Sequence, residues 1–122
     1  MKLNVVIVED DPWQAALYTR VLKTGGFAAV TARSTQEAID IIDDSKPAAI
    51  ILDLLLPGAT AMTLLNELQS HSDLAVIPVV IATSSPEQLS LQTVSPYGVT
   101  QILDKSTMHP NELLTAVRRV TS

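Results

Sequence analysis

The sequence predicts an α/β fold in which five parallel β-strands alternate with five α-helices along 122 residues. Three observations support this prediction. Short apolar segments alternate five times with longer segments whose apolar residues recur every three to four positions. The third short segment, residues 48–52, is continuously apolar, which is typical of a strand buried on both faces of a parallel sheet. Pro, Gly, Asp or Ser residues separate the segments at almost every junction. A doubly wound parallel sheet with helices on both faces follows from this pattern.

Each element has its own start or stop signal. Asp11 is placed to cap a first helix that begins at Pro12 and ends at Gly25. Ser34 opens the second helix with a capping box. Ser85-Pro86 opens the fourth with a cap followed by proline, as Asp11-Pro12 does for the first. The predicted strands cover residues 3–8, 27–32, 48–53, 77–83 and 99–103. The predicted helices cover 12–24, 35–45, 61–70, 86–95 and 110–120.

The strand over residues 48–53 is central to the functional prediction. Five apolar residues lead directly to Asp53, and three leucines and a Pro-Gly pair follow it. A charge in such apolar surroundings is costly unless it is paired or bound to a metal. A carboxylate that caps the next loop is the simpler alternative. In the flavodoxin-like strand order 2-1-3-4-5, this strand lies beside the one over residues 3–8, so Asp53 is expected near the acids that follow residue 8.

Polar residues with complementary chemistry end four of the five predicted strands. Glu9 and Asp10 follow the first strand, and together with Asp53 they form a cluster of three carboxylates that a cation would stabilise. Hard oxygen ligands with open positions indicate Mg²⁺ rather than Zn²⁺ or Ca²⁺. Thr83 and Lys105 end the fourth and fifth strands and are suited to binding phosphoryl oxygens. The set therefore predicts an aspartyl-phosphate site with Asp53 as the nucleophile.

Composition excludes several other classes. The chain contains no cysteine, so it has neither a disulfide framework nor a thiol nucleophile. The net charge of −5 argues against direct binding of nucleic acid. No apolar run approaches the length of a membrane span, and a cytoplasmic protein that does not bind membranes is expected.

Over its whole length, as a single domain of residues 1–122, the chain resembles the receiver domains of bacterial two-component response regulators. The resemblance rests on residues 8–12, on Leu52-Asp53 with Pro57-Gly58, and on residues 78–84 and 103–105. It implies that Asp53 accepts a phosphoryl group from a phosphohistidine of a sensor histidine kinase or a histidine phosphotransfer protein. The result would be a switch that binds a downstream target protein, and not an enzyme with an external substrate. The face formed by the fourth helix, fifth strand and fifth helix is where the resemblance places output and a homodimer contact.

The resemblance also assigns roles to the candidate site residues. Glu9, Asp10 and Asp53 would hold Mg²⁺ together with the main-chain carbonyl of Leu55. Thr83 and Lys105 would bind the phosphoryl oxygens.

Several positions depart from the family pattern. Ile102 stands where receivers usually carry Tyr or Phe, so relay of the signal through an aromatic ring is not expected. Ser106 replaces the usual proline after a cis bond, which predicts a trans bond between Lys105 and Ser106. The residues at 60 and 61 differ from the common Asp-Gly, which affects only the start of the third helix. Leu55 cannot orient an attacking water, which favours a long-lived phosphorylated form.

Three other functions compete with that of a phosphorylated switch. A flavodoxin-type cofactor site needs a first loop that binds phosphate, whereas the acids at residues 9–11 repel anions. An aspartate-dependent phosphatase usually has a second acid where this chain has Leu55. A degenerate receiver that binds proteins without phosphorylation is disfavoured by the intact Asp53, Thr83 and Lys105, but Ile102 keeps it open.

Overall fold

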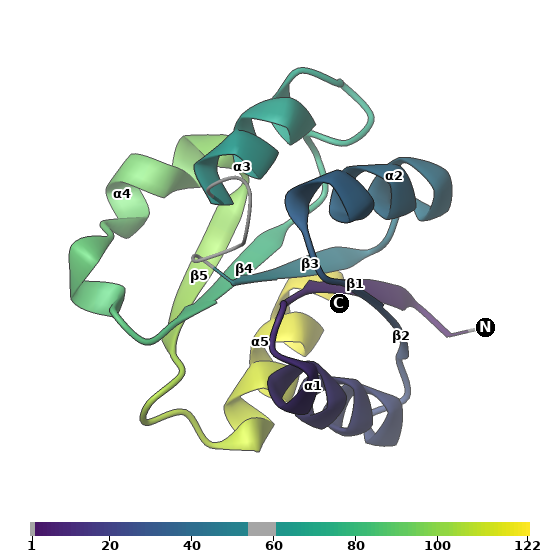
Figure 1. Ribbon diagram of the computed structural model, residues 1–122, viewed down its shortest axis with the longest axis vertical. Helices are drawn as coiled ribbons and strands as arrows, with labels where there is room; N and C mark the ends of the chain where they lie inside the picture. The colour runs from purple at the N-terminus through teal and green to yellow at the C-terminus, as the bar shows by residue number, and fades with distance from the viewer. Residues whose placement is uncertain (1, 54–60) are drawn as a thin grey trace.

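A single five-stranded parallel sheet runs through the computed structural model, which describes residues 2–53 and 61–122 (Figure 1). The strand order β2-β1-β3-β4-β5 is the predicted one, and every neighbouring pair is parallel. Predicted and observed strand boundaries differ by no more than two residues. The strands are β1 (Asn4–Val8), β2 (Ala28–Ala32), β3 (Ala49–Asp53), β4 (Val79–Thr83) and β5 (Val99–Asp104).

Four of the five predicted helices are confirmed, and the first turns of α1 and α2 use the predicted caps. The Asp11 carboxylate accepts the N–H of Trp13 at 3.0 Å, and Ser34 Oγ accepts the N–H of Glu37 at 3.2 Å. These bonds satisfy backbone donors that have no partner inside the helix. The four helices are α1 (Pro12–Thr24), α2 (Thr35–Ser45), α3 (Ala61–Gln69) and α5 (Pro110–Thr121).

The predicted continuous helix over residues 86–95 is wrong. The segment divides into a 3₁₀ turn η1 (Pro86–Gln88), a single helical turn α4 (Leu91–Val94) and a second 3₁₀ turn η2 (Ser95–Tyr97). Leu89 is extended and interrupts the helix. Val94 is the one side chain of α4 that is buried. A short helix gains most of its stability from packing an apolar face, and within α4 the buried part of that face is limited to Val94.

The helices form two layers that cover the sheet (Figure 1). α1 and α5 pack on one face, where Leu22 and Val117 meet Ile7 and Ile51 of the central strands. α2, α3 and α4 pack on the other face. Both faces of β3 and β4 are therefore buried, which is the reason for their continuously apolar sequences. Because all strands are parallel, their carboxyl ends meet at one rim of the sheet. Among the described helices, none has the length and apolar character required to span a membrane.

Candidate functional site

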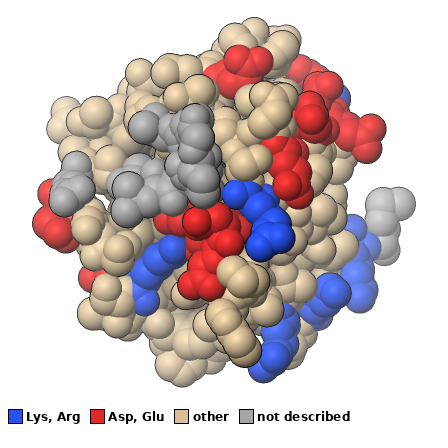
Figure 2. Space-filling view, viewed as in Figure 1, with Lys and Arg blue, Asp and Glu red and all other residues tan. Residues whose placement is uncertain are grey.

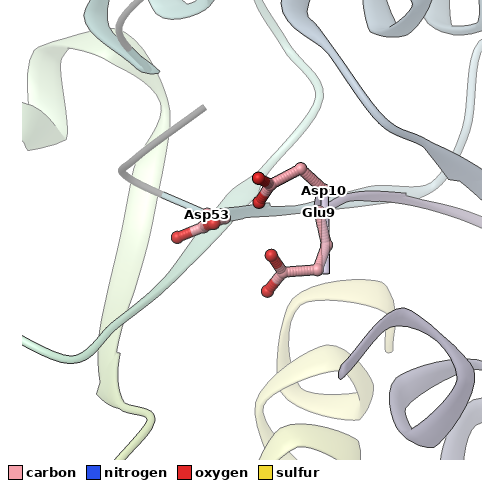
Figure 3. A group of neighbouring side chains, drawn as sticks. All are labelled: Glu9, Asp10 and Asp53. Carbon is pink, nitrogen blue, oxygen red and sulfur yellow. The ribbon is translucent and has the colours of Figure 1, made fainter. Parts of the chain in front are cut away.

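Three carboxylates converge where β1 and β3 end. Val8 pairs with Leu52 in the sheet, so Glu9 and Asp53 leave neighbouring strands side by side. Glu9, Asp10 and Asp53 each offer a carboxylate oxygen, and these oxygens lie within 4.8 Å of one another (Figure 3). Glu9 and Asp53 are buried, with 2% and 8% of their surface exposed, whereas Asp10 is half-exposed. The rim thus places two buried acids beside one that solvent can reach.

Lys105 supplies the positive charge of this rim. Its Nζ lies 2.6 Å from Glu9 Oε1 and 3.2 Å from Asp53 Oδ1. The backbone N–H of Lys105 donates to the carbonyl of Thr83 at 2.8 Å, which anchors the residue at the end of β4. The predicted proximity of Lys105 to Asp53 is therefore present, and the closer contact with Glu9 was not predicted.

Thr83 ends β4, next to β3 in the sheet. Ala82 is the register partner of Asp53, so Thr83 lies one residue beyond the phosphoacceptor candidate along the neighbouring strand. The side chain is buried, and its Oγ1 accepts the N–H of Ser85 at 3.1 Å. That bond uses the oxygen as an acceptor and leaves the hydroxyl proton available for another partner.

The pKa values of Glu9 and Lys105 are shifted by burial and by the charges around them. Burial raises the pKa of Glu9 to about 7, and the neighbouring Asp53 adds to this shift while Lys105 opposes it. Burial by itself lowers the pKa of Lys105, but the hydrogen bond to Glu9 and the charge of Asp53 outweigh it, so this pKa lies above its usual value. The rim has less positive charge than its carboxylates require, and an added cation would be stabilised there.

The donor set fits a magnesium ion. Ligand oxygens about 2.1 Å from an octahedral Mg²⁺ lie roughly 3 to 4.2 Å from one another. The carboxylate oxygens here lie within 4.8 Å of one another, an upper limit slightly above that range. Because Asp10 is half-exposed, water and phosphoryl oxygens can complete the coordination. The fourth ligand inferred from the sequence, the carbonyl of Leu55, lies outside the described residues.

Two departures from the family pattern are visible. Ile102 is half-buried in β5 beside Ile81 and packs against the apolar layer formed with α2, α3 and α4. The Lys105–Ser106 bond is trans, as predicted, since none of the described peptide bonds is cis. The N–H of Ser106 donates to Asp104 Oδ1 at 2.8 Å, a bond that proline could not make. Leu55 and Thr60 lie outside the described residues.

The sheet and its rim together define a doubly wound α/β domain with an acidic, lysine-containing site at the carboxyl ends of its strands. Residues 5–118 match the model of the response regulator receiver domain, and the chain belongs to this family. It is therefore a signalling domain of two-component systems.

Individual relatives agree with this assignment. The chain is 26% identical to the DNA-binding response regulator MtrA of Mycolicibacterium smegmatis over 118 residues, covering 97% of this chain and 50% of MtrA. It is 29% identical to the polar-differentiation response regulator DivK of Brucella ovis over 84 residues, covering 69% of this chain and 68% of DivK. The chain thus spans about half of MtrA and about two thirds of DivK.

Solved structures support the same fold. A sensor protein from Polaromonas sp. JS666 superposes with a TM-score of 0.91 at 25% identity, covering 99% of this chain and 97% of that one. The chemotaxis response regulator CheY4 of Vibrio cholerae superposes with a TM-score of 0.87 at 24% identity, covering 98% and 99% of the two chains.

Proposed function

We propose that this chain is a phosphorylation-controlled switch in which Asp53 accepts a phosphoryl group in a Mg²⁺-dependent reaction. The donor is a phosphohistidine of a sensor histidine kinase or a histidine phosphotransfer protein in the cytoplasm. The observation that supports this most directly is the position of Asp53, buried at the end of a central strand with Lys105 Nζ at 3.2 Å and two further carboxylates beside it.

The chemistry follows from these neighbours. A carboxylate oxygen of Asp53 forms a bond to phosphorus while the bond between phosphorus and the histidine nitrogen breaks, and that nitrogen keeps the electron pair. Mg²⁺, held by Glu9, Asp10 and Asp53, would offset the negative charge that gathers between carboxylate and phosphoryl group. Once Mg²⁺ neutralises Glu9, Lys105 would release Glu9 and bind a phosphoryl oxygen instead. Thr83 would donate its free hydroxyl proton to a second phosphoryl oxygen.

The output of the switch is a changed binding surface for a downstream target protein. The chain acts on its own Asp53 and not on an external substrate. Movement of Thr83 toward the phosphoryl group would reshape the adjoining segment from Ser84 to Leu89. This segment leads into α4, and the face formed by α4, β5 and α5 is our candidate for target binding or for a homodimer contact.

Phosphorylation of Asp53 can be tested by intact-mass spectrometry after incubation with acetyl phosphate. We expect one phosphoryl adduct in the wild type with Mg²⁺, none with EDTA, and none in Asp53→Ala under either condition. Asp104→Ala is a suitable control, because Asp104 is a neighbouring acid that does not belong to the carboxylate cluster. Absence of an adduct in the wild type under all conditions would favour the degenerate receiver that binds partners through its acidic rim.

A second prediction concerns how the signal leaves the site, since Ile102 provides no aromatic ring to relay it. We expect the segment after Thr83 to change instead. Addition of beryllofluoride and Mg²⁺, which together mimic the phosphoryl group, should shift the amide NMR signals of residues 84–89 in addition to those of the metal site. The same addition to Thr83→Ala should leave the signals of residues 84–89 near their starting positions. Shifts confined to residues 9, 10 and 53 in the wild type would contradict the proposed relay.

A further inference from the structure

A groove of about 640 Å³ runs between α1 and the edge strand β2, and at one end it reaches Glu9 of the carboxylate cluster. It exists because the facing side chains are small: Ala15 and Ala16 on α1 cannot fill the space in front of Thr31 on β2. Its volume lies within the range of about 300–1,000 Å³ that is usual for small-molecule sites. Pro12 and the two alanines provide an apolar wall against which a flat ring could pack.

Positive charge is concentrated along this groove. Arg20 and Lys23 line it from α1, and Arg33 lines it from the loop after β2. All three are exposed, and none forms an ion pair or a side-chain hydrogen bond with any described residue. Figure 2 shows Lys and Arg side chains gathered on the side of the molecule where α1 and β2 lie. Such a concentration is unexpected in a chain of net charge −5 with only eight Lys and Arg residues.

The remaining polar groups of the groove add hydrogen-bonding capacity. Thr19, Thr24 and Thr31 place hydroxyls along it. Thr19 Oγ1 already donates to the carbonyl of Ala15 at 2.8 Å, which leaves its lone pairs as acceptors. Glu9 reaches the groove, but its carboxylate is committed to Lys105. The anion-binding character of the groove therefore comes from the three cations.

We propose that the groove between α1 and β2 binds a nucleotide, with Arg20 and Arg33 binding the phosphate and the alanine wall packing against the base. Two guanidinium groups match phosphate because each can donate two parallel hydrogen bonds to a pair of its oxygens. The combination of an apolar wall, hydroxyls and cations fits a ligand that is aromatic at one end and anionic at the other. The inference does not depend on phosphorylation of Asp53.

The test is a titration of the ¹⁵N-labelled chain, in EDTA and at low salt, with AMP, adenosine and inorganic phosphate in turn. We expect AMP to shift the amide signals of Ala16, Thr19 and Thr31 saturably, and to bind at least about tenfold more tightly than adenosine or phosphate alone. The double variant Arg20→Gln/Arg33→Gln should weaken AMP binding by about tenfold or more, because it removes two charge-assisted contacts. The matched control Arg118→Gln/Arg119→Gln removes the same charge from exposed positions on α5 and should change the affinity by less than about twofold.

The outcomes separate this site from the phosphoacceptor site. AMP binding that persists in Asp53→Ala and stays sensitive to Arg20→Gln/Arg33→Gln supports the proposal, whatever the result with acetyl phosphate. Absence of saturable shifts, or equal affinity in both double variants, would overturn it. AMP shifts centred on residues 9, 10 and 53 that vanish in Asp53→Ala would also overturn it, because they would place the anion at the carboxylate cluster. Thermal unfolding of each variant confirms that it is folded before titration.

Discussion

Replacing Lys105 with glutamine is expected to lower the free energy of unfolding of the metal-free chain by about 3 kcal/mol at pH 8. The lysine Nζ contacts Glu9 and Asp53, both buried carboxylates. Its removal leaves two buried carboxylates side by side with no positive partner. The folded chain must then either hold unpaired buried charge or take up a proton at pH 8, and both cost more than a lost surface contact. Urea denaturation in EDTA, followed by circular dichroism, measures this loss.

Lys46→Gln provides the matched control. Lys46 contacts Asp73 at 3.2 Å, but both side chains are about half exposed. Surface pairs of this kind contribute little to stability because water screens both charges. Saturating Mg²⁺ should restore much of the stability that Lys105→Gln loses, since the ion supplies the missing charge, and should leave Lys46→Gln unchanged. A Lys105→Gln chain as stable as Lys46→Gln in EDTA would show that the carboxylates do not depend on the lysine.

The metal-free chain is expected to become less stable as the pH rises from 5 to 8. Burial raises the pKa of Glu9 from 4.5 to about 7 in the folded state, so the folded chain holds this proton more tightly than the unfolded chain. The stabilisation is complete below pH 4.5 and is lost as the pH rises through about 7. At pH 8 the pKa shift corresponds to a loss on the order of 3 kcal/mol. Lys105, whose pKa lies above its usual value, stays protonated throughout and does not contribute to the slope.

Glu9→Gln should remove most of this pH dependence, because glutamine does not titrate, and should make the metal-free chain more stable than the wild type at pH 8. Glu87→Gln, at an exposed position in η1, should retain the wild-type slope. Unfolding free energies at pH 5, 6, 7 and 8 in EDTA provide the comparison. A wild-type slope that survives unchanged in Glu9→Gln would assign the pH dependence to other groups.

Mg²⁺ should bind more tightly as the pH rises, because the ion competes with the proton for the Glu9 carboxylate. The ion needs the ionised carboxylate of Glu9, so its apparent affinity should rise by about tenfold between pH 6 and pH 8 and level off above pH 8. Trp13 is 86% exposed, and its backbone N–H donates to Asp11 beside the cluster, which makes its fluorescence a candidate reporter for the titration. Equal affinities at pH 6 and pH 8 would contradict the assignment of a raised pKa to Glu9.

Local features of the sequence were sufficient for much of the fold. Continuous apolar runs identified β3 and β4, and Asp11 and Ser34 marked the starts of α1 and α2. These signals are local because a strand buried on both faces needs apolar residues throughout, and because a helix cap bonds within three residues of itself. The prediction of the fourth helix was wrong because packing, and not a local signal, decides whether that helix continues. Its serine–proline start was present, but its apolar face was too small to stabilise a continuous helix, and the chain is extended at Leu89.

The sequence alone determined the fold class and the acids that meet at the rim, since parallel strands bring their carboxyl ends to one edge whatever the details of packing. Tertiary structure decided how those groups interact. Glu9 and Lys105 are 96 residues apart, and only the folded chain shows that the lysine lies nearer to Glu9 than to Asp53. The raised pKa of Glu9 likewise depends on burial by elements distant in sequence. The groove between α1 and β2 depends on the same three-dimensional information, because an empty volume is set by which small residues face each other across a helix and a strand.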